Sequence, residues 1–235
     1  LGIYFDNAIE ATKKSKEKVV AMHILIITGG GIDMPFTHSY IKEQTFDKII
    51  AADKGVQYAI QLGVKPDFIL GDFDSLGEKW KKKMEQWQVP ILTFPPEKDY
   101  TDTHLAIEYA IEQGAEESTL LGATGTRLDH TWANIGLLQL AMKKGVHAHI
   151  VDKHNRITMI CEKTVIKRED AFGDFISLIP YTEKVTGITL TGFYYPLEDA
   201  ELTLGISLGI SNELVDEIGI IQIGRGNLLV IESRD

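Results

Sequence analysis

Cysteine is almost absent from this sequence of 235 residues: Cys161 is the only one, so no disulfide can form within the chain. We expect a reducing compartment, and we expect Cys161 to lie in the core because its neighbours carry no nucleophile signature. No hydrophobic run approaches the roughly 20 residues that cross a membrane. The start of the sequence also lacks the apolar stretch and cleavage pattern of a secretory signal. These absences predict a cytoplasmic protein.

Basic residues are also few, with 24 Lys and Arg against 34 Asp and Glu, for a net charge of −10. This balance argues against broad binding to nucleic acid or to anionic membranes. An anionic ligand would therefore need local help from a metal ion or an arginine. With 44% hydrophobic residues, the chain can bury a substantial core and is long enough for one large or two small domains.

Two carboxylates, Asp72 and Asp74, follow the apolar residues 68–70 and are separated by one residue. In an extended chain, side chains i and i+2 lie on the same side, so both carboxylates can converge on one cation. Magnesium prefers oxygen ligands and keeps positions for water and phosphate oxygens. We interpret the pair as half of a magnesium site for a nucleotide. The alternative is a strand that ends in a solvated acidic turn.

A second acidic cluster contains Asp99 and Asp102, just before a run with helical spacing at residues 105–110. A helix that starts near Asp102 and stops near Gly114 places this cluster in a strand-to-helix loop. The helix dipole there favours ionised, metal-binding carboxylates. Simple N-capping by Thr101 or Asp102 is the alternative, but it leaves Asp99 without a role.

A glycine-rich segment, residues 122–130, follows a short apolar strand at 119–121 and precedes a helical pattern at 132–140. Glycines let the backbone approach a ligand closely, and Arg127 offers a planar fork of donors for phosphate oxygens. The segment could cradle a polyphosphate, although it matches neither the Walker A nor the GxGxxG pattern. His130, ahead of a helix, is more typical of a capping or structural histidine than of a base.

Taken together, five motifs in this order resemble the thiamine pyrophosphokinase (thiamin diphosphokinase) family. The resemblance extends from about residue 24 to the C-terminal residues. Residues 1–21 fall outside it, and Met22 directly precedes the first predicted strand, so we expect 1–21 to be an N-terminal extension. The motifs are Ala52-Asp53-Lys54-Gly55, Gly71-Asp-Phe-Asp-Ser75, Lys98-Asp-Tyr-Thr-Asp102, Gly125-Thr-Arg-Leu-Asp-His130 and Ile210-Ser211-Asn212-Glu213.

The resemblance implies transfer of diphosphate from ATP to the thiamine hydroxyl, which gives thiamine diphosphate and AMP. It also implies a homodimer with shared active sites. Four aspartates would hold Mg²⁺. The same aspartates and Arg127 would be the catalytic residues. Further contacts to the nucleotide would come from a second set of residues. The metal ligands are Asp72, Asp74, Asp99 and Asp102, and the nucleotide-binding residues are Asp53, Gly125, Arg127, Asp129 and His130.

The resemblance places thiamine at Ser211 and Asn212, whose short side chains with donors and acceptors suit its aminopyrimidine edge. We expect the two residues to follow an apolar strand at 206–210. Ser-Asn after a strand is also a common turn, and that alternative stays open.

The organisation changes near residue 154. Before it, strands at 24–28, 48–52, 68–70, 90–94, 118–121 and 146–151 alternate with helical patterns, which predicts a mostly parallel α/β sheet over 22–154. The acidic and glycine motifs follow strand ends, at the edge where such sheets bind ligands. After it, short strands at 157–161, 174–179, 185–190, 201–204, 220–223 and 228–231 predict a thiamine-binding β-sandwich or jelly-roll-like domain over 155–235.

Two other classes of function are compatible with parts of the pattern. A strand followed by Asp-x-Asp also occurs in phosphohydrolases that use the first aspartate as a nucleophile, and these need no second substrate. A non-catalytic module that senses thiamine diphosphate or a nucleotide is the second alternative.

Overall fold

The computed structural model of the chain describes residues 21–71, 73, 76–93 and 100–235. Asp72, Asp74 and Asp99, three of the predicted metal ligands, lie outside these residues. The described part of the N-terminal half contains six parallel strands in the order β4-β3-β2-β1-β5-β6, as predicted. The strands are β1 (His23–Ile27), β2 (Lys48–Ala52), β3 (Phe68–Leu70), β4 (Ile91–Leu92), β5 (Glu117–Leu121) and β6 (His147–Val151).

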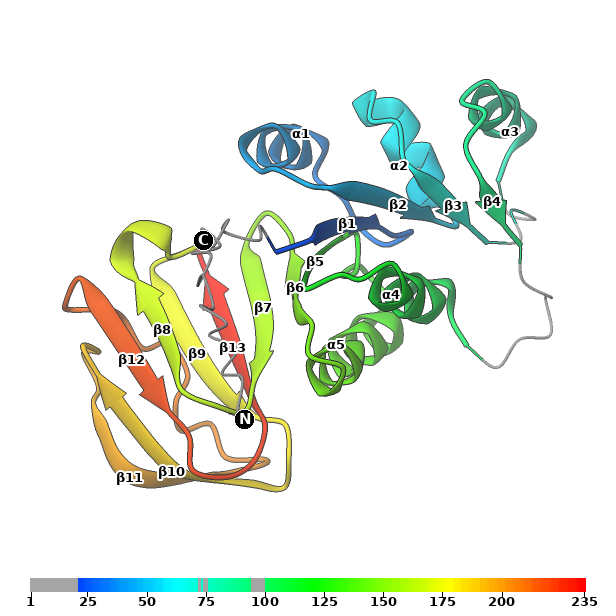
Figure 1. Ribbon diagram of the computed structural model, residues 1–235. Coiled ribbons are helices and arrows are strands. Elements are labelled where there is room, and N and C mark those ends of the chain that lie inside the picture. Colours follow the sequence, from blue (N-terminus) through cyan, green and yellow to red (C-terminus); the bar gives the residue numbers. More distant parts are fainter. Residues whose placement is uncertain (1–20, 72, 74–75, 94–99) are drawn as a thin grey trace, which may run out of the picture.

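Helices cover both faces of this sheet (Figure 1). Strand β1 shows why, since Ile24 to Ile27 are all fully buried, the pattern of a parallel strand packed on both sides. Leu25 and Ile27 belong to the hydrophobic cluster on the side of α1, α2 and α3, whereas Ile24 and Ile26 belong to the cluster on the side of α4 and α5. The helices are α1 (Met34–Glu43), α2 (Gly55–Leu62), α3 (Glu78–Glu85), α4 (Asp102–Glu112) and α5 (Leu128–Lys143).

The same sheet continues into the C-terminal half. β7 (Asn155–Ile160) pairs antiparallel with β6, and β13 (Leu228–Ser233) and β9 (Phe175–Pro180) follow, which makes nine strands among the described residues. The predicted division at residue 154 falls in the turn between β6 and β7. The two halves are therefore neighbours within one sheet, which Figure 1 shows as an unbroken layer.

A second, four-stranded sheet packs against this C-terminal part of the large sheet (Figure 1). Leu178 and Leu228 of the large sheet share a hydrophobic cluster with Val185, Ile188 and Ile221 of the small one. The predicted β-sandwich is thereby confirmed. The small sheet has the order β11 (Leu197–Thr203), β10 (Lys184–Thr191), β12 (Ile218–Gln222) and β8 (Thr164–Lys167), and a short 3₁₀ helix η1 (Arg168–Asp170) follows β8.

Two expectations are wrong. The strand predicted at residues 206–210 is a loop, because Gly205 and Gly209 adopt left-handed backbone, with φ of 91° and 97°, and so interrupt the extended conformation of this segment. Cys161 is exposed rather than buried in the core, because β7 ends at the residue before it. In the part of the chain that the structure describes, no helix is long and apolar enough to cross a bilayer.

Candidate active site

A cavity of about 780 Å³ lies at the carboxyl ends of the parallel strands, among the loops after β1, β2 and β5 and the first turns of α4 and α5. Strand β1 lies between β2 and β5, so the chain order reverses at this point of the sheet. Open α/β sheets bind their ligands at such a switch point. The cavity is lined by residues 28–31, 52–54, 58, 100–103, 122–127, 130, 131 and 134.

Backbone hydrogen bonds join the loops after β1 and β5 beyond the ends of the strands. The Gly30 N–H donates to the Gly122 carbonyl at 2.7 Å, and the Gly31 N–H donates to the Thr124 carbonyl at 2.6 Å. A Cβ on Gly30 would lie 2.3 Å from the Gly122 oxygen and 2.4 Å from the Thr124 oxygen, so only glycine fits there. This glycine loop is absent from the residues predicted for the site. Its signal was the Gly-Gly-Gly run directly after the first buried strand.

Side-chain hydrogen bonds also hold the loops after β1 and β5 in place. The Tyr58 hydroxyl donates to the Gly30 carbonyl at 2.9 Å, and the buried Asn134 amide donates to the Ala123 carbonyl at 2.8 Å. The Thr124 hydroxyl donates to the Asp152 carboxylate at 2.9 Å. These bonds are made within the protein, so the cavity wall is preformed and needs no ligand to order it.

Asp53 lines the cavity at the end of β2, where its φ of 47° turns the chain out of the strand. Its N–H donates to the Leu70 carbonyl of β3 at 2.8 Å. A Cβ on Gly71 would lie 3.3 Å from the Asp53 nitrogen, so the two backbones touch. The structure thus brings together Asp53 and the beginning of the Gly71 motif, which are 18 residues apart by their numbers.

The acidic cluster before α4 reaches the same cavity through Asp102. Thr101 is the N-cap, and its hydroxyl accepts a hydrogen bond from the His104 N–H at 3.2 Å. Asp102 is the first helical residue and lines the cavity at the positive end of the helix dipole. Of the two candidates for simple capping, Thr101 therefore has that role.

Arg127 lines the cavity just before α5, and it forms a two-pronged ion pair with Asp129. Its Nη2 lies 2.6 Å from Asp129 Oδ2 and its Nε lies 3.3 Å from Asp129 Oδ1. The hydrogen bond from Arg127 is the main cause that lowers the pKa of Asp129, and the same bond raises the pKa of Arg127. Asp129 does not line the cavity, so its contact is with Arg127. Gly125 and His130 do line it.

Ser211 and Asn212 lie in the C-terminal half, away from the cavity lining. Asn212 is buried, and its side-chain oxygen accepts from the Tyr195 and Glu213 N–H groups, both at 2.9 Å. Its amide donates to the Tyr195 carbonyl at 2.8 Å. This side chain therefore joins residue 213 to the chain at Tyr195, which is 17 residues from Asn212, and both of its polar groups are used within the protein. Ser211 is exposed, with a φ of 55°.

An open, mostly parallel α/β sheet with a polar, glycine-lined cavity at its switch point defines a ligand-binding α/β protein, extended here by a β-sandwich. The family model described as thiamin pyrophosphokinase, catalytic domain, matches residues 38–150, and the model for its vitamin B1 binding domain matches residues 163–228. The chain belongs to the thiamine pyrophosphokinase family and is an enzyme of the diphosphotransferase kind.

Relatives of full length support the same assignment. Thiamine pyrophosphokinase of Bacillus subtilis is 35% identical over 213 residues, which cover 90% of this chain and 99% of the relative. The crystal structure of the B. subtilis enzyme superposes with a TM-score of 0.82 at 32% identity, over 91% of this chain and 99% of that chain. The thiamin pyrophosphokinase of Geobacillus thermodenitrificans has a TM-score of 0.80 at 33% identity, over 91% and 98%.

Proposed function

We propose that this enzyme transfers diphosphate from ATP to the hydroxyl of thiamine, with Mg²⁺, and releases thiamine diphosphate and AMP. The observation that carries the proposal is the cavity at the switch point, because its lining unites Asp53, Asp102 and Arg127 from three separate motifs. Family membership supports the reaction class. The exposed Cys161 thiol suits a reducing compartment, and we propose the cytoplasm.

In this proposal, the polyphosphate of ATP lies between the glycine loops after β1 and β5. Arg127 would leave Asp129 to bind phosphate oxygens, which accept the same planar fork of donors. Attack by a neutral alcohol on the β-phosphorus needs in-line alignment, which the preformed loops would supply, and neutralisation of charge, which Arg127 would supply.

The donor set of the cavity fits a magnesium ion, since Asp53 and Asp102 both bring carboxylate oxygens to it. We propose Asp102 as a ligand together with Asp72, Asp74 and Asp99. When bound, Mg²⁺ would offset the negative charge of the phosphate groups. Asp53 would contact the metal or the substrate, and Gly125 and His130 would flank the nucleotide.

Thiamine would bind between the acidic cavity and the loop that carries Ser211. The thiazolium charge of thiamine suits acidic surroundings, and the Ser211 hydroxyl is exposed for a hydrogen bond. Asn212 would act indirectly, because its hydrogen bonds to Tyr195 and Glu213 fix the backbone next to Ser211.

A second copy of the chain would complete this site. The cavity is lined by residues between 28 and 134, whereas Ser211 belongs to the C-terminal half. The loop before Ser211 exposes a run of large apolar side chains, which a dimer would bury. We propose a homodimer with shared active sites in which this apolar loop contacts the partner. The exposed apolar side chains of this loop are Leu204, Ile206, Leu208 and Ile210, each between 45% and 62% exposed.

The double substitution Ile206→Asp/Leu208→Asp is expected to convert the dimer into a monomer, because four buried carboxylates per dimer would lack partners. Light scattering at fixed protein concentration measures the mass, and turnover should fall with it. Ile91→Asp is the matched control, since Ile91 is 42% exposed on β4 at the other edge of the sheet. A dimeric double variant, or a wild-type protein that is monomeric, would refute the assigned interface.

Arg127→Lys tests the contact to ATP. Lysine keeps the charge but loses the two-pronged geometry, so we expect the apparent KM for ATP to rise by about tenfold. Initial rates at saturating thiamine measure it. Lys153→Arg, at an exposed residue outside this cavity, is the control. If Arg127→Ala leaves both the KM for ATP and kcat unchanged, Arg127 does not bind the donor.

The reaction itself is tested by incubating the protein with ATP, Mg²⁺ and thiamine. AMP and thiamine diphosphate in equal amounts are expected. Free phosphate with unchanged thiamine would instead indicate the phosphohydrolase, and binding without any product would indicate the sensor. Omission of thiamine is the control, because AMP formation should then stop.

A further inference from the structure

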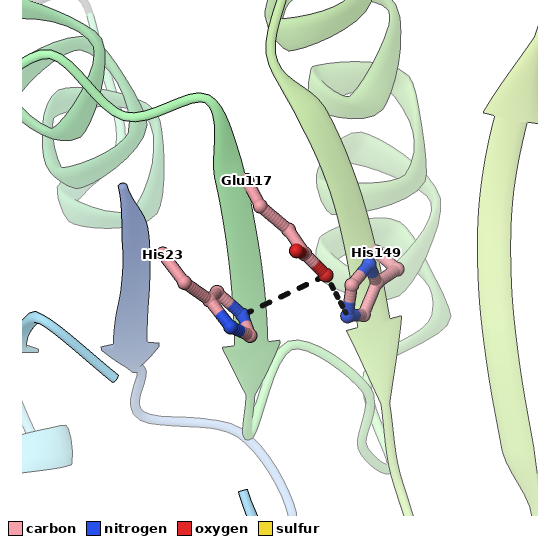
Figure 2. Close-up of side chains that lie close together, drawn as sticks. All are labelled: His23, Glu117 and His149. Carbon is pink, nitrogen blue, oxygen red and sulfur yellow. Dashed lines mark ion pairs between the residues drawn. The ribbon is translucent and has the colours of Figure 1, made fainter. Parts of the chain in front are cut away.

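Three side chains with metal-binding atoms meet at the opposite end of the sheet from the cavity. His23 begins β1, Glu117 begins β5 and His149 lies in β6 (Figure 2). Glu117 Oε1 is 3.9 Å from His23 Nε2 and 3.8 Å from His149 Nε2. Thr119 Oγ1 lies between the two rings, 2.8 Å from His23 Nε2 and 2.9 Å from His149 Nε2. Two imidazoles, a carboxylate and a hydroxyl thus share one small volume.

The strand register explains this arrangement. His23 is opposite Glu117 in the pairing of β1 with β5, and Thr119 is opposite His149 in the pairing of β5 with β6. Glu117 and Thr119 are two residues apart on one strand, so all four side chains lie on the same face. The Phe46 ring packs edge-on against His23, with 4.6 Å between centroids. Three adjacent buried strands therefore fix the cluster before any ion binds.

We propose that His23, Glu117 and His149 bind a divalent transition-metal ion of the Zn²⁺ type. Two imidazoles and a carboxylate are an established donor set for zinc, with bonds of about 2.0 to 2.2 Å. Tetrahedral ligands at such distances are about 3.4 Å apart, so the two separations from Glu117 need to close by only about half an ångström. All three ligand atoms lie within 4.8 Å of one another. Thr119 or a water molecule would take the fourth position.

The Glu117 carboxylate forms no hydrogen bond with the imidazole rings of His23 and His149. A threonine hydroxyl has one proton, so Thr119 can donate to one histidine and must accept from the other. Both distances from Glu117 to the rings exceed the length of a hydrogen bond.

This site is separate from the proposed magnesium site. His23 and Thr28 are five residues apart along β1 and the loop it leads into, a distance of roughly 16 Å in extended chain. Nitrogen donors also favour zinc-like ions over magnesium. A metal ion bound here would link β1, β5 and β6 at the end of the sheet opposite the cavity. We therefore expect the ion to stabilise the fold and to leave turnover nearly unchanged.

The experiment uses the full chain, stripped with chelator and dialysed into buffer with excess Mg²⁺ to fill sites that prefer oxygen ligands. Zn²⁺ is expected to raise the melting temperature, and Co²⁺ is expected to give the visible absorption of a tetrahedral site at one equivalent. His23→Gln and Glu117→Gln should each weaken Zn²⁺ binding by at least about tenfold. His38→Gln, at an exposed residue of α1, is the matched control and should bind like wild type.

Glu117→Gln is the decisive variant, because Glu117 is partly exposed and glutamine keeps its shape, so the fold should tolerate the change. The inference is overturned if this variant binds Zn²⁺ as tightly as wild type, or if wild type shows neither a Zn²⁺-dependent melting temperature nor Co²⁺ absorption. Equal turnover of wild type and Glu117→Gln would support a role apart from catalysis. A loss of turnover at unchanged Zn²⁺ affinity would also overturn the assignment.

Discussion

Replacement of Asp72 or Asp74 by asparagine will lower kcat by about a hundredfold or more, while the protein stays folded. Asparagine keeps the size of the side chain but removes the charge that a magnesium ligand supplies, and a hundredfold corresponds to about 2.7 kcal/mol of transition-state stabilisation. Steady-state rates at saturating ATP and thiamine, over a range of Mg²⁺ concentrations, measure the effect. The apparent affinity for Mg²⁺ should fall in the same variants.

Asp170→Asn controls for the loss of one carboxylate, because Asp170 is exposed on η1 in the C-terminal half. Its turnover should equal that of wild type. Circular dichroism and the melting temperature confirm that each variant is folded. A folded Asp72→Asn/Asp74→Asn double variant with wild-type turnover would remove both residues from the proposed metal site.

The parallel part of the sheet was predictable because most of its strands are buried on both faces. Strands β2 and β3 were predicted with the bounds that the structure shows, since each is an apolar run followed by a turn or a charged motif. Strand β8 was missed because only Ile166 of its four residues is buried, which leaves no apolar pattern. The loop at 206–210 was taken for a strand because Ile206, Leu208 and Ile210 recur at every second residue, which is the period of a strand, although all three are exposed.

Long-range pairing was not predictable from local patterns. β13 joins β7 and β9 although it is separated from them by more than 45 residues, and a sequence pattern shows which face of a strand is buried but not its neighbour. The shared sheet of the two halves, in contrast, follows from the antiparallel pairing of β7 with β6, its neighbour along the chain.

The charged residues that line the cavity could be predicted from the sequence. The part of the cavity wall that consists of backbone alone could not. Asp53, Asp102 and Arg127 reach one cavity, as expected of motifs that follow neighbouring parallel strands. Gly30 contributes no side chain, so its role became visible only through the close approach of the β5 loop. Asn212 had the right chemistry for a ligand, but its bonds to Tyr195 and Glu213 depend on a fold that local sequence does not reveal.

Gly30→Ala is expected to lower kcat/KM for ATP by about a hundredfold. The new methyl group would lie 2.3 Å from the Gly122 oxygen and 2.4 Å from the Thr124 oxygen, so the two loops must move apart. Their hydrogen bonds at 2.7 and 2.6 Å would be lost or lengthened, and a displacement of about 1 Å in a positioning loop can cost a hundredfold in rate. Such overpacking should also reduce the free energy of unfolding by about 1 to 3 kcal/mol.

Gly31→Ala separates this contact from the general effect of replacing glycine. A Cβ on Gly31 would meet its nearest atoms at 3.5 Å, an ordinary contact, and neither glycine has a positive φ that alanine would resist. The Gly31 variant should therefore keep turnover within about threefold of wild type, because alanine costs little where backbone and space allow it. Initial rates over a range of ATP concentrations, with denaturant unfolding of both variants, make the comparison. Equal activity of the two variants would mean that the close packing of the β1 and β5 loops does not position ATP, and the nucleotide would have to be placed elsewhere in the cavity.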